Sequence, residues 1–215
     1  EIYTLSLHDA LPIFGRTRFL QTINRKKYRM VLSEIKGGNL HNAIAREATA
    51  IVGVKEKYKE EMRVMLNTFL AQLQNEYKRT DPNLNIEMES VEAPPHVIGN
   101  GVARRLLLAL YGCPHGVIGM SQDIKGMVET STNLASVKML PENRIEVVTS
   151  QRSSVESQKQ YAVNMVSSVF ELAEAEVTHN DGYPAWQPNP DSNILKLSAR
   201  SEERRVGKEC RSRWS

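Results

Sequence analysis

The chain has 215 residues, of which 40% are hydrophobic and 25% charged, and a formal net charge of +3. This length suffices for one or two domains with a buried core, and the composition is ordinary for a globular protein. Two cysteines, Cys113 and Cys210, exclude a disulfide framework and fit a reducing compartment. No apolar run approaches the roughly 20 residues of a membrane span, and no signal peptide is recognisable. We therefore expect a cytoplasmic protein with no membrane partner.

The two ends of the chain read as translations of sequencing-adapter DNA. A DNA sequence that encodes residues 1–13 also encodes most of residues 200–215 when its opposite strand is read in another frame. Two unrelated protein segments have little reason to be antisense to each other, so we interpret both as artefacts. The alternative is a disordered acidic start and a basic amphipathic tail. Without them the net charge is about +2 and the main basic cluster is lost, so no nucleic-acid partner is expected.

The residues between the ends show the hydrophobic periodicities of helices and strands. Apolar residues three and four apart predict helices, whereas alternating or β-branched runs predict strands. In chain order we predict a short helix at 14–27, strands at 30–35 and 47–54, a long helix at 55–78, a strand at 84–91, a helix at 101–111, strands at 128–139 and 144–150, a helix at 154–173 and a short strand at 175–178.

Local signals refine this order. Residues 140–143 predict a hairpin turn, and residues 112–119, which contain Gly and Pro, read as irregular. Ser153 and Glu156 match a capping box. The order of elements predicts an α+β fold of ferredoxin-like character, an antiparallel sheet with helices packed on one face. Residues 181–199, rich in proline and aromatic side chains at their start, predict a connector to another domain.

The residues alone indicate little chemistry. The five histidines form none of the short spacings that zinc-hydrolase motifs require, and no nucleophile elbow or phosphate-binding loop is present. Cys113 and His115 are two residues apart, but a single Cys and His without a second pair are a weak metal signal. We expect no metal ligands and no catalytic residues in this chain. His115 is more simply interpreted as a buried structural residue than as part of a site mouth.

Five sequence runs, in one order, nevertheless resemble a known family. They are Gly37 to Ala48 (GGNLHNAIAREA), Leu106 to Ser121 (LLLALYGCPHGVIGMS), Val128 to Met139 (VETSTNLASVKM), Thr149 to Ser154 (TSQRSS) and Asp181 to Pro190 (DGYPAWQPNP). Together they resemble the aminoacyl-histidine dipeptidases, also called cytosol non-specific dipeptidases. The resemblance extends from about Gly15 to Ala199, and several ordered motifs are far more specific than one.

The resemblance implies a fragment of a larger enzyme. Members of this family have a catalytic domain with two zinc ions and an inserted lid domain with a ferredoxin-like core. They hydrolyse dipeptides, including Xaa-His types, and the lid commonly forms the homodimer. Residues 14–180 would be the lid domain, and residues 181–199 the connector back to the catalytic domain. The zinc ligands and the general base would lie outside this chain, which would then be inactive alone.

Two lid positions carry over from the resemblance as substrate-binding residues. Asn42 matches the asparagine of the family's N-A-I-P run, which contacts the substrate. Arg152 matches an arginine that binds the C-terminal carboxylate of the dipeptide, and a guanidinium can pair with both carboxylate oxygens. The simpler alternatives are a turn residue for Asn42 and a surface arginine for Arg152.

The chain departs from the family pattern at two positions, and neither removes a functional group. Ala45 stands where the family has proline, and Ala185 stands where it usually has glycine. A second interpretation of the whole chain remains open, namely a standalone α+β interaction or dimerisation module without catalytic function.

Overall fold

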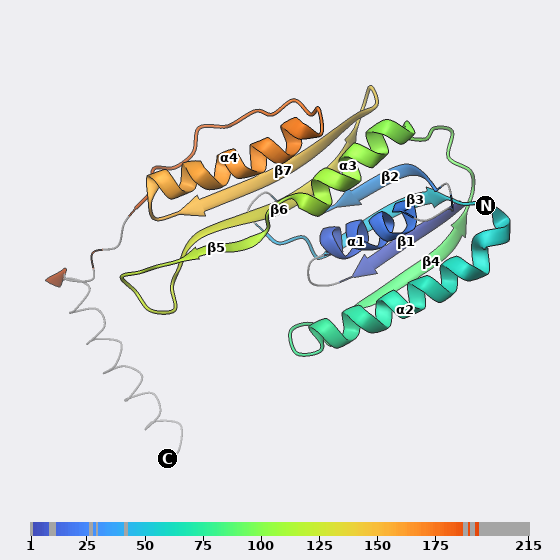
Figure 1. Cartoon of the computed structure of the whole chain (residues 1–215), viewed down its shortest axis with the longest axis horizontal. Helices are drawn as coiled ribbons and strands as arrows, with labels where there is room; N and C mark the ends of the chain where they lie inside the picture. Colours follow the sequence, from blue (N-terminus) through green and yellow to red (C-terminus); the bar gives the residue numbers. More distant parts are fainter. Residues whose placement is uncertain are drawn as a thin grey trace, which may run out of the picture.

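The computed structural model describes residues 2–8, 12–25, 28, 30–40, 43–186, 189, 192 and 193. Within these residues the chain forms an α+β fold of seven strands, four α-helices and one 3-10 helix (Figure 1). The elements are β1 (Ile2–His8), α1 (Pro12–Arg25), β2 (Val31–Gly37), β3 (Glu47–Gly53), η1 (Glu56–Tyr58), α2 (Lys59–Tyr77), β4 (Asn85–Val91), α3 (Asn100–Gly112), β5 (Gly116–Met120), β6 (Val128–Leu140), β7 (Arg144–Ser153) and α4 (Glu156–Leu172).

The first half of the chain confirms the predicted ferredoxin-like core. Its elements follow the order β1, α1, β2, β3, α2, β4, and its antiparallel strands lie side by side in the order β4-β1-β3-β2. β1 pairs along its whole length with β3 on one side and β4 on the other. The predicted domain start at residue 14 therefore falls inside α1, and the sheet includes β1. The adapter origin of residues 1–13 stays a prediction.

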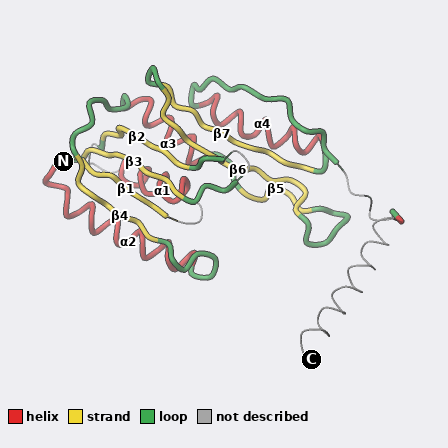
Figure 2. The backbone as a smooth tube through the Cα atoms, turned by 180° about the vertical axis from the view of Figure 1, so that it is seen from behind, coloured by secondary structure: helices red, strands yellow, loops and turns green. Residues whose placement is uncertain are grey.

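The second half extends this sheet. β6 meets β2 through the pair Gly37 and Val137, and it also pairs with β5 and β7. In the view from behind, the strands lie in front of the helices, so the helices cover one face and leave the other open (Figure 2). The open face is where side chains can meet a ligand or another domain.

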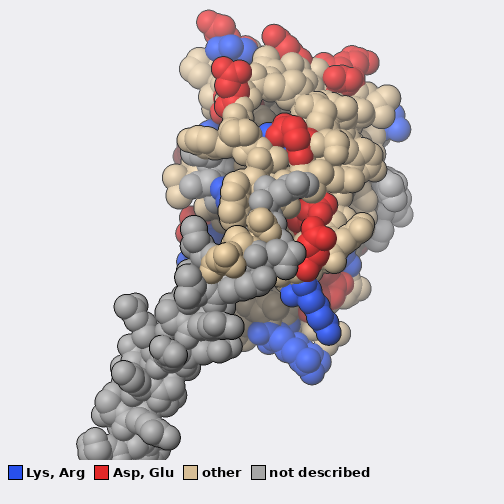
Figure 3. All heavy atoms as spheres, turned by 90° about the vertical axis from the view of Figure 1, so that its left-hand side faces the viewer, with Lys and Arg blue, Asp and Glu red and all other residues tan. Residues whose placement is uncertain are grey.

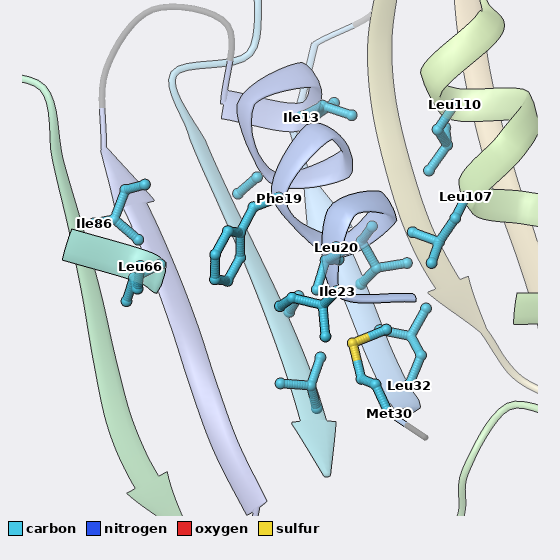
Figure 4. Close-up of a cluster of buried hydrophobic side chains, with 14 of the residues drawn as sticks. Ile13, Phe19, Leu20, Ile23, Met30, Leu32, Leu66, Ile86, Leu107 and Leu110 are labelled. Carbon is cyan, nitrogen blue, oxygen red and sulfur yellow. The ribbon is translucent and has the colours of Figure 1, made fainter. Parts of the chain in front are cut away.

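The hydrophobic core lies between the sheet and the helices. Figure 4 shows Phe19, Leu20 and Ile23 of α1 at its centre, with Leu107 and Leu110 of α3 beside them. The three α1 side chains are at most 3% exposed, which their spacing of one, three and four residues predicts for one helix face. Burial of such side chains contributes about 1.5–3 kcal/mol each, so this layer is the main stabilising feature of the fold.

The long helix predicted at 55–78 is confirmed, but the α-helix begins later, at Lys59. Its first turn is the separate 3-10 helix η1, and α2 then runs to Tyr77. The residues of α2 that are buried follow the predicted apolar face: Met62, Leu66, Phe69 and Leu73. Arg18, in the middle of α1, also donates two hydrogen bonds to Glu76 near the end of α2, at 2.7 and 2.9 Å, which link the two helices.

Three local predictions are wrong. The segment interpreted as irregular contains β5, because Gly116 to Met120 pair with β6 through shifts of register that its glycines permit. No strand forms at residues 175–178. The capping box at Ser153 is not formed, because α4 begins at Glu156 itself. The Ser153 hydroxyl instead accepts from the Val155 amide at 3.1 Å, and Glu156 accepts from the Ala185 amide at 3.0 Å.

The segment after α4 runs back along that helix (Figure 1). Lys159 of α4 donates to the carbonyl oxygen of Tyr183 at 2.8 Å, and Glu156 holds Ala185. The aromatic side chains of Tyr183 and Trp186 are 94% and 75% exposed. Most of the predicted connector beyond residue 186 lies outside the described residues.

Candidate functional site

A hollow of about 350 Å³ lies on the open side of the β6–β7 hairpin. Arg152 of β7 lies opposite Ser131 of β6, and Ser150 lies opposite Asn133. Because alternate residues of a strand face the same side of a sheet, these four side chains share one face. The residues around the hollow are Ile44, His115, Gly116, Val117, Val128, Ser131, Thr132, Asn133, Ser150 and Arg152.

The strand that carries Arg152 is fixed at its end. On the other face of the hairpin, the hydroxyls of Thr130 and Ser153 lie 2.9 Å apart, and Gln151 donates to Thr132 at 3.1 Å. The amide of Ser154 then donates to the carbonyl of Glu129 at 3.2 Å. The backbone at Arg152 is therefore held on both sides, while its side chain is free to extend from the open face.

Arg152 itself is exposed. It forms no hydrogen bond or ion pair with any residue that the structure describes. By contrast, Arg18, Arg63 and Arg105 each pair with a glutamate. An unpaired guanidinium beside the Ser131 and Ser150 hydroxyls, with Ile44 and Val117 at the rim, is a suitable receptor for a small anion with an apolar part.

His115 forms the wall between β5 and β6. It follows the end of α3 and precedes β5, and its Nδ1 accepts a hydrogen bond from the Leu134 amide at 3.0 Å. Burial lowers the pKa of His115, because a charged imidazolium is poorly solvated there. The preference for a structural role is thus correct in part, since the imidazole is half-buried and also borders the hollow.

The loop between β2 and β3 forms the far side of the hollow. Asn133 donates through Nδ2 to the carbonyl of Ala43 at 2.9 Å, which holds this loop against β6. The Oδ1 atom of Asn133 is buried and has no partner among the described residues. Asn42, the second predicted substrate-binding residue, lies outside the described residues, and its prediction is not tested. Asn133, Ser131 and Ser150 also border the hollow, although no sequence motif indicated them as residues of the site.

No metal centre is found in the described part of the chain. There, no three His, Cys, Asp or Glu side chains come close enough together to hold an ion. Cys113 is buried, and this burial raises the pKa of its thiol to about 12, which keeps the thiol protonated. The described residues therefore do not fit the zinc that the resemblance implies, and no catalytic step through a metal is assigned to them.

Two comparisons with known proteins agree with this architecture. The cytosol non-specific dipeptidase of Escherichia coli (strain K12) is 33% identical over 177 residues, which are 82% of this chain and 36% of the relative. The crystal structure of aminoacylhistidine dipeptidase from Vibrio alginolyticus matches 91% of this chain and 42% of that chain, with a TM-score of 0.86 and 28% identity. These two matches support a fragment of the dipeptidase family.

The match to the dipeptidases covers only part of their length. The chain spans less than half of each of these two relatives, and no protein-family model matches it. Within the described residues, no helix combines the length and the apolar character needed to cross a membrane. The matches thus support a dipeptidase-family fragment, whereas the activity, the substrate and the partners of the whole protein are matters for proposal.

Proposed function

We propose that this chain supplies the lid of a zinc-dependent dipeptidase and that Arg152 binds the C-terminal carboxylate of the dipeptide. The observation that carries the proposal is the position of Arg152, which borders the hollow on the open face of the sheet. Its guanidinium has no partner among the described residues. Two parallel hydrogen bonds from one guanidinium to one carboxylate would orient the substrate as well as bind it.

Recognition of a carboxylate also explains how such an enzyme distinguishes dipeptides from longer peptides. In a dipeptide the free carboxylate lies one residue from the bond that is cleaved, whereas in a longer peptide that position is an amide. A fixed cation at that distance favours the dipeptide, because an amide leaves the guanidinium without its ionic partner. In this proposal the hydroxyls of Ser131 and Ser150 provide further donors around the carboxylate.

The remaining parts of the enzyme lie outside the chain in this proposal. Two zinc ions would activate water and polarise the peptide carbonyl, held by a catalytic domain that this chain does not include. The chain alone would then be inactive, and the complete protein would be a cytoplasmic homodimer formed through the lid. On the face shown in Figure 3, acidic and basic side chains both occur among uncharged ones, which is not the one-sided basic surface typical of a nucleic-acid interface.

The test of this proposal is the kinetics of the complete enzyme with Arg152→Gln. We expect kcat/KM for dipeptides to fall about 10- to 100-fold, the equivalent of one charge-assisted hydrogen-bonding pair. Dipeptide amides, which have no free carboxylate, should be hydrolysed equally by both forms. Loss of the preference for dipeptides over their amides is therefore the specific signature of the proposed role.

The matched control is Arg144→Gln, which removes an exposed arginine from the opposite end of the same strand β7. This variant should keep the kinetics of the unmodified enzyme. If Arg152→Gln retains more than about half of kcat/KM, or if both variants lose activity equally, Arg152 does not bind the carboxylate.

A standalone interaction module is the alternative function. The single hydrophobic core favours it, since the two halves of the fold share one sheet and one buried cluster. Resequencing the source DNA outward past both ends distinguishes the two. Flanking codons for His, Asp and Glu ligands would support the dipeptidase, whereas a start near Phe14 and a stop near Ala199 would support the module.

A further inference from the structure

One edge of β6 has a gap, because no strand of the described residues pairs with it between Thr132 and Val137. On this edge β5 pairs with β6 up to Thr132, and β2 pairs with it at Val137. The amide of Leu134 lies between these two contacts, and Leu134 is only 2% exposed. A buried amide without an acceptor would destabilise the fold, so the backbone here requires a partner that neither strand provides.

The imidazole of His115 provides this partner. Its Nδ1 accepts from the Leu134 amide at 3.0 Å, and His115 lies directly before the first residue of β5. The side chain thus continues the ladder where the backbone of β5 has ended. Since Nδ1 acts as the acceptor, the proton of the neutral ring is on Nε2. A second proton on Nδ1 would turn the acceptor into a donor that faces another donor.

We propose that His115 is a positioning residue that joins β5 to β6 across this gap, and that protonation of its imidazole releases the wall of the hollow beside Arg152. The consequence extends to Asn133, the neighbour of Leu134, which holds the β2–β3 loop through Ala43. The hollow should therefore have its full shape only while His115 is neutral. This inference rests on the proposed function only in taking the hollow as the ligand site.

The surroundings of His115 determine the direction of the pH effect. Among the described residues around the hollow, Arg152 on β7 is the charged one, while those on β6 and the β2–β3 loop are uncharged. Cys113, on the segment of His115 itself, stays neutral because its pKa is raised to about 12. Burial lowers the pKa of His115 from its ordinary value of about 6.5. The hydrogen bond from the Leu134 amide to His115 is therefore intact above about pH 6.5 and is lost as the pH falls through the lowered pKa.

The test uses His115→Asn, because the Oδ1 of asparagine occupies nearly the same place as Nδ1 of histidine but does not titrate. In the unmodified chain, amide NMR signals of Leu134 and of the Asn133 side chain should shift with one midpoint below about pH 6.5. Exchange of the Leu134 amide, corrected for its intrinsic pH dependence, should become at least about 10-fold faster at acid pH. In His115→Asn, both signals should remain constant over this range.

The control is His96→Asn, which replaces an exposed histidine in the loop between β4 and α3. In this variant the Leu134 amide signal should shift with pH as it does in the unmodified chain. The inference is overturned if the Leu134 signal does not titrate, or if it titrates equally in His115→Asn. His115→Ala removes the acceptor altogether, and fast exchange of Leu134 at every pH in this variant would support the inference.

A second readout separates this inference from the proposed function. N-acetylalanine, which has one free carboxylate, is titrated into the unmodified chain and into Arg152→Gln. Binding that Arg152→Gln abolishes supports the carboxylate site, and absence of binding contradicts it. Neither result bears on the pH-dependent shift of the Leu134 signal, which tests the role of His115.

Discussion

At the residue scale, burial of single polar groups decides their chemistry. Cys113 and His115 are two residues apart, and a metal site was the one chemical role that their spacing allowed. In the structure the two side chains have different surroundings. The Cys113 residue is buried at 4% exposure, whereas the His115 ring accepts a hydrogen bond from Leu134 and borders the hollow. Sequence spacing could not reveal this difference, since it depends on how the end of α3 turns into β5.

The burial of Cys113 gives a testable difference in reactivity. The thiolate is the reactive form, and a pKa of about 12 leaves almost none of it at neutral pH. With Cys210→Ser removing the other cysteine, Cys113 in the native chain should react with a thiol reagent more than about 100-fold slower than in the urea-unfolded chain. Equal rates in the two states would show that the thiol is accessible.

At the element scale, Gly38, which directly follows β2, allows the backbone there to lie close to the backbone of β6. Gly38 has a φ of 70°, and a Cβ atom there would lie 1.9 Å from the carbonyl oxygen of Ala135. Its amide also donates to Glu47 at 3.2 Å, which closes the β2–β3 connection. The GGN run that contributed to the family resemblance is thus explained by close backbone contact, which only glycine tolerates.

Gly38→Ala should therefore lower the free energy of unfolding by about 3 kcal/mol or more, because it combines backbone strain with a clash against backbone. Gly126→Ala is the matched control, since its φ is 84° but its Cβ would have nothing within 4 Å. The control should lose only about 1 kcal/mol from strain. Urea denaturation of both variants measures the difference, and equal losses would contradict the clash.

The β6–β7 hairpin shows how far an element can be predicted. The turn predicted at residues 140–143 forms at residues 141–143, because β6 extends to Leu140, and Glu142 and Asn143 have positive φ angles. Counting back from Leu140 and Arg144 would place Arg152 opposite Thr132. A bulge between Leu134 and Ser136 shifts the register by one, so Arg152 lies opposite Ser131 instead. Since a slip of one residue exchanges the faces of a strand, the partners of Arg152 depend on that bulge.

At the scale of the whole molecule, the described residues form a fold that lacks the metal ligands of a zinc hydrolase. The comparisons cover most of this chain but less than half of each relative. If the zinc ligands come from a separate domain, as we propose, this chain alone cannot complete the metal site. The position of Arg152 on the open face agrees with a surface that another domain covers.

Zinc binding tests the proposal that the metal ligands lie outside this chain. The 215-residue chain, equilibrated with zinc and then dialysed, should retain no more metal than a protein of similar size without a metal site. Its melting temperature should not rise with added zinc, because a ligand stabilises only a state that binds it. Stoichiometric zinc after dialysis, or a melting temperature that rises with zinc concentration, would place a metal site within this chain.

The sequence alone predicted the resemblance to the dipeptidases, the α+β class and most helices and strands, because these depend on local periodicity and on ordered motifs. It also identified Arg152 as a candidate ligand for a carboxylate. Tertiary structure alone decided what surrounds Arg152. The bulge in β6, the pairing of short β5 and the bond from Leu134 to His115 are contacts between residues distant in sequence, and their geometry follows from packing of the whole sheet rather than from local sequence preferences.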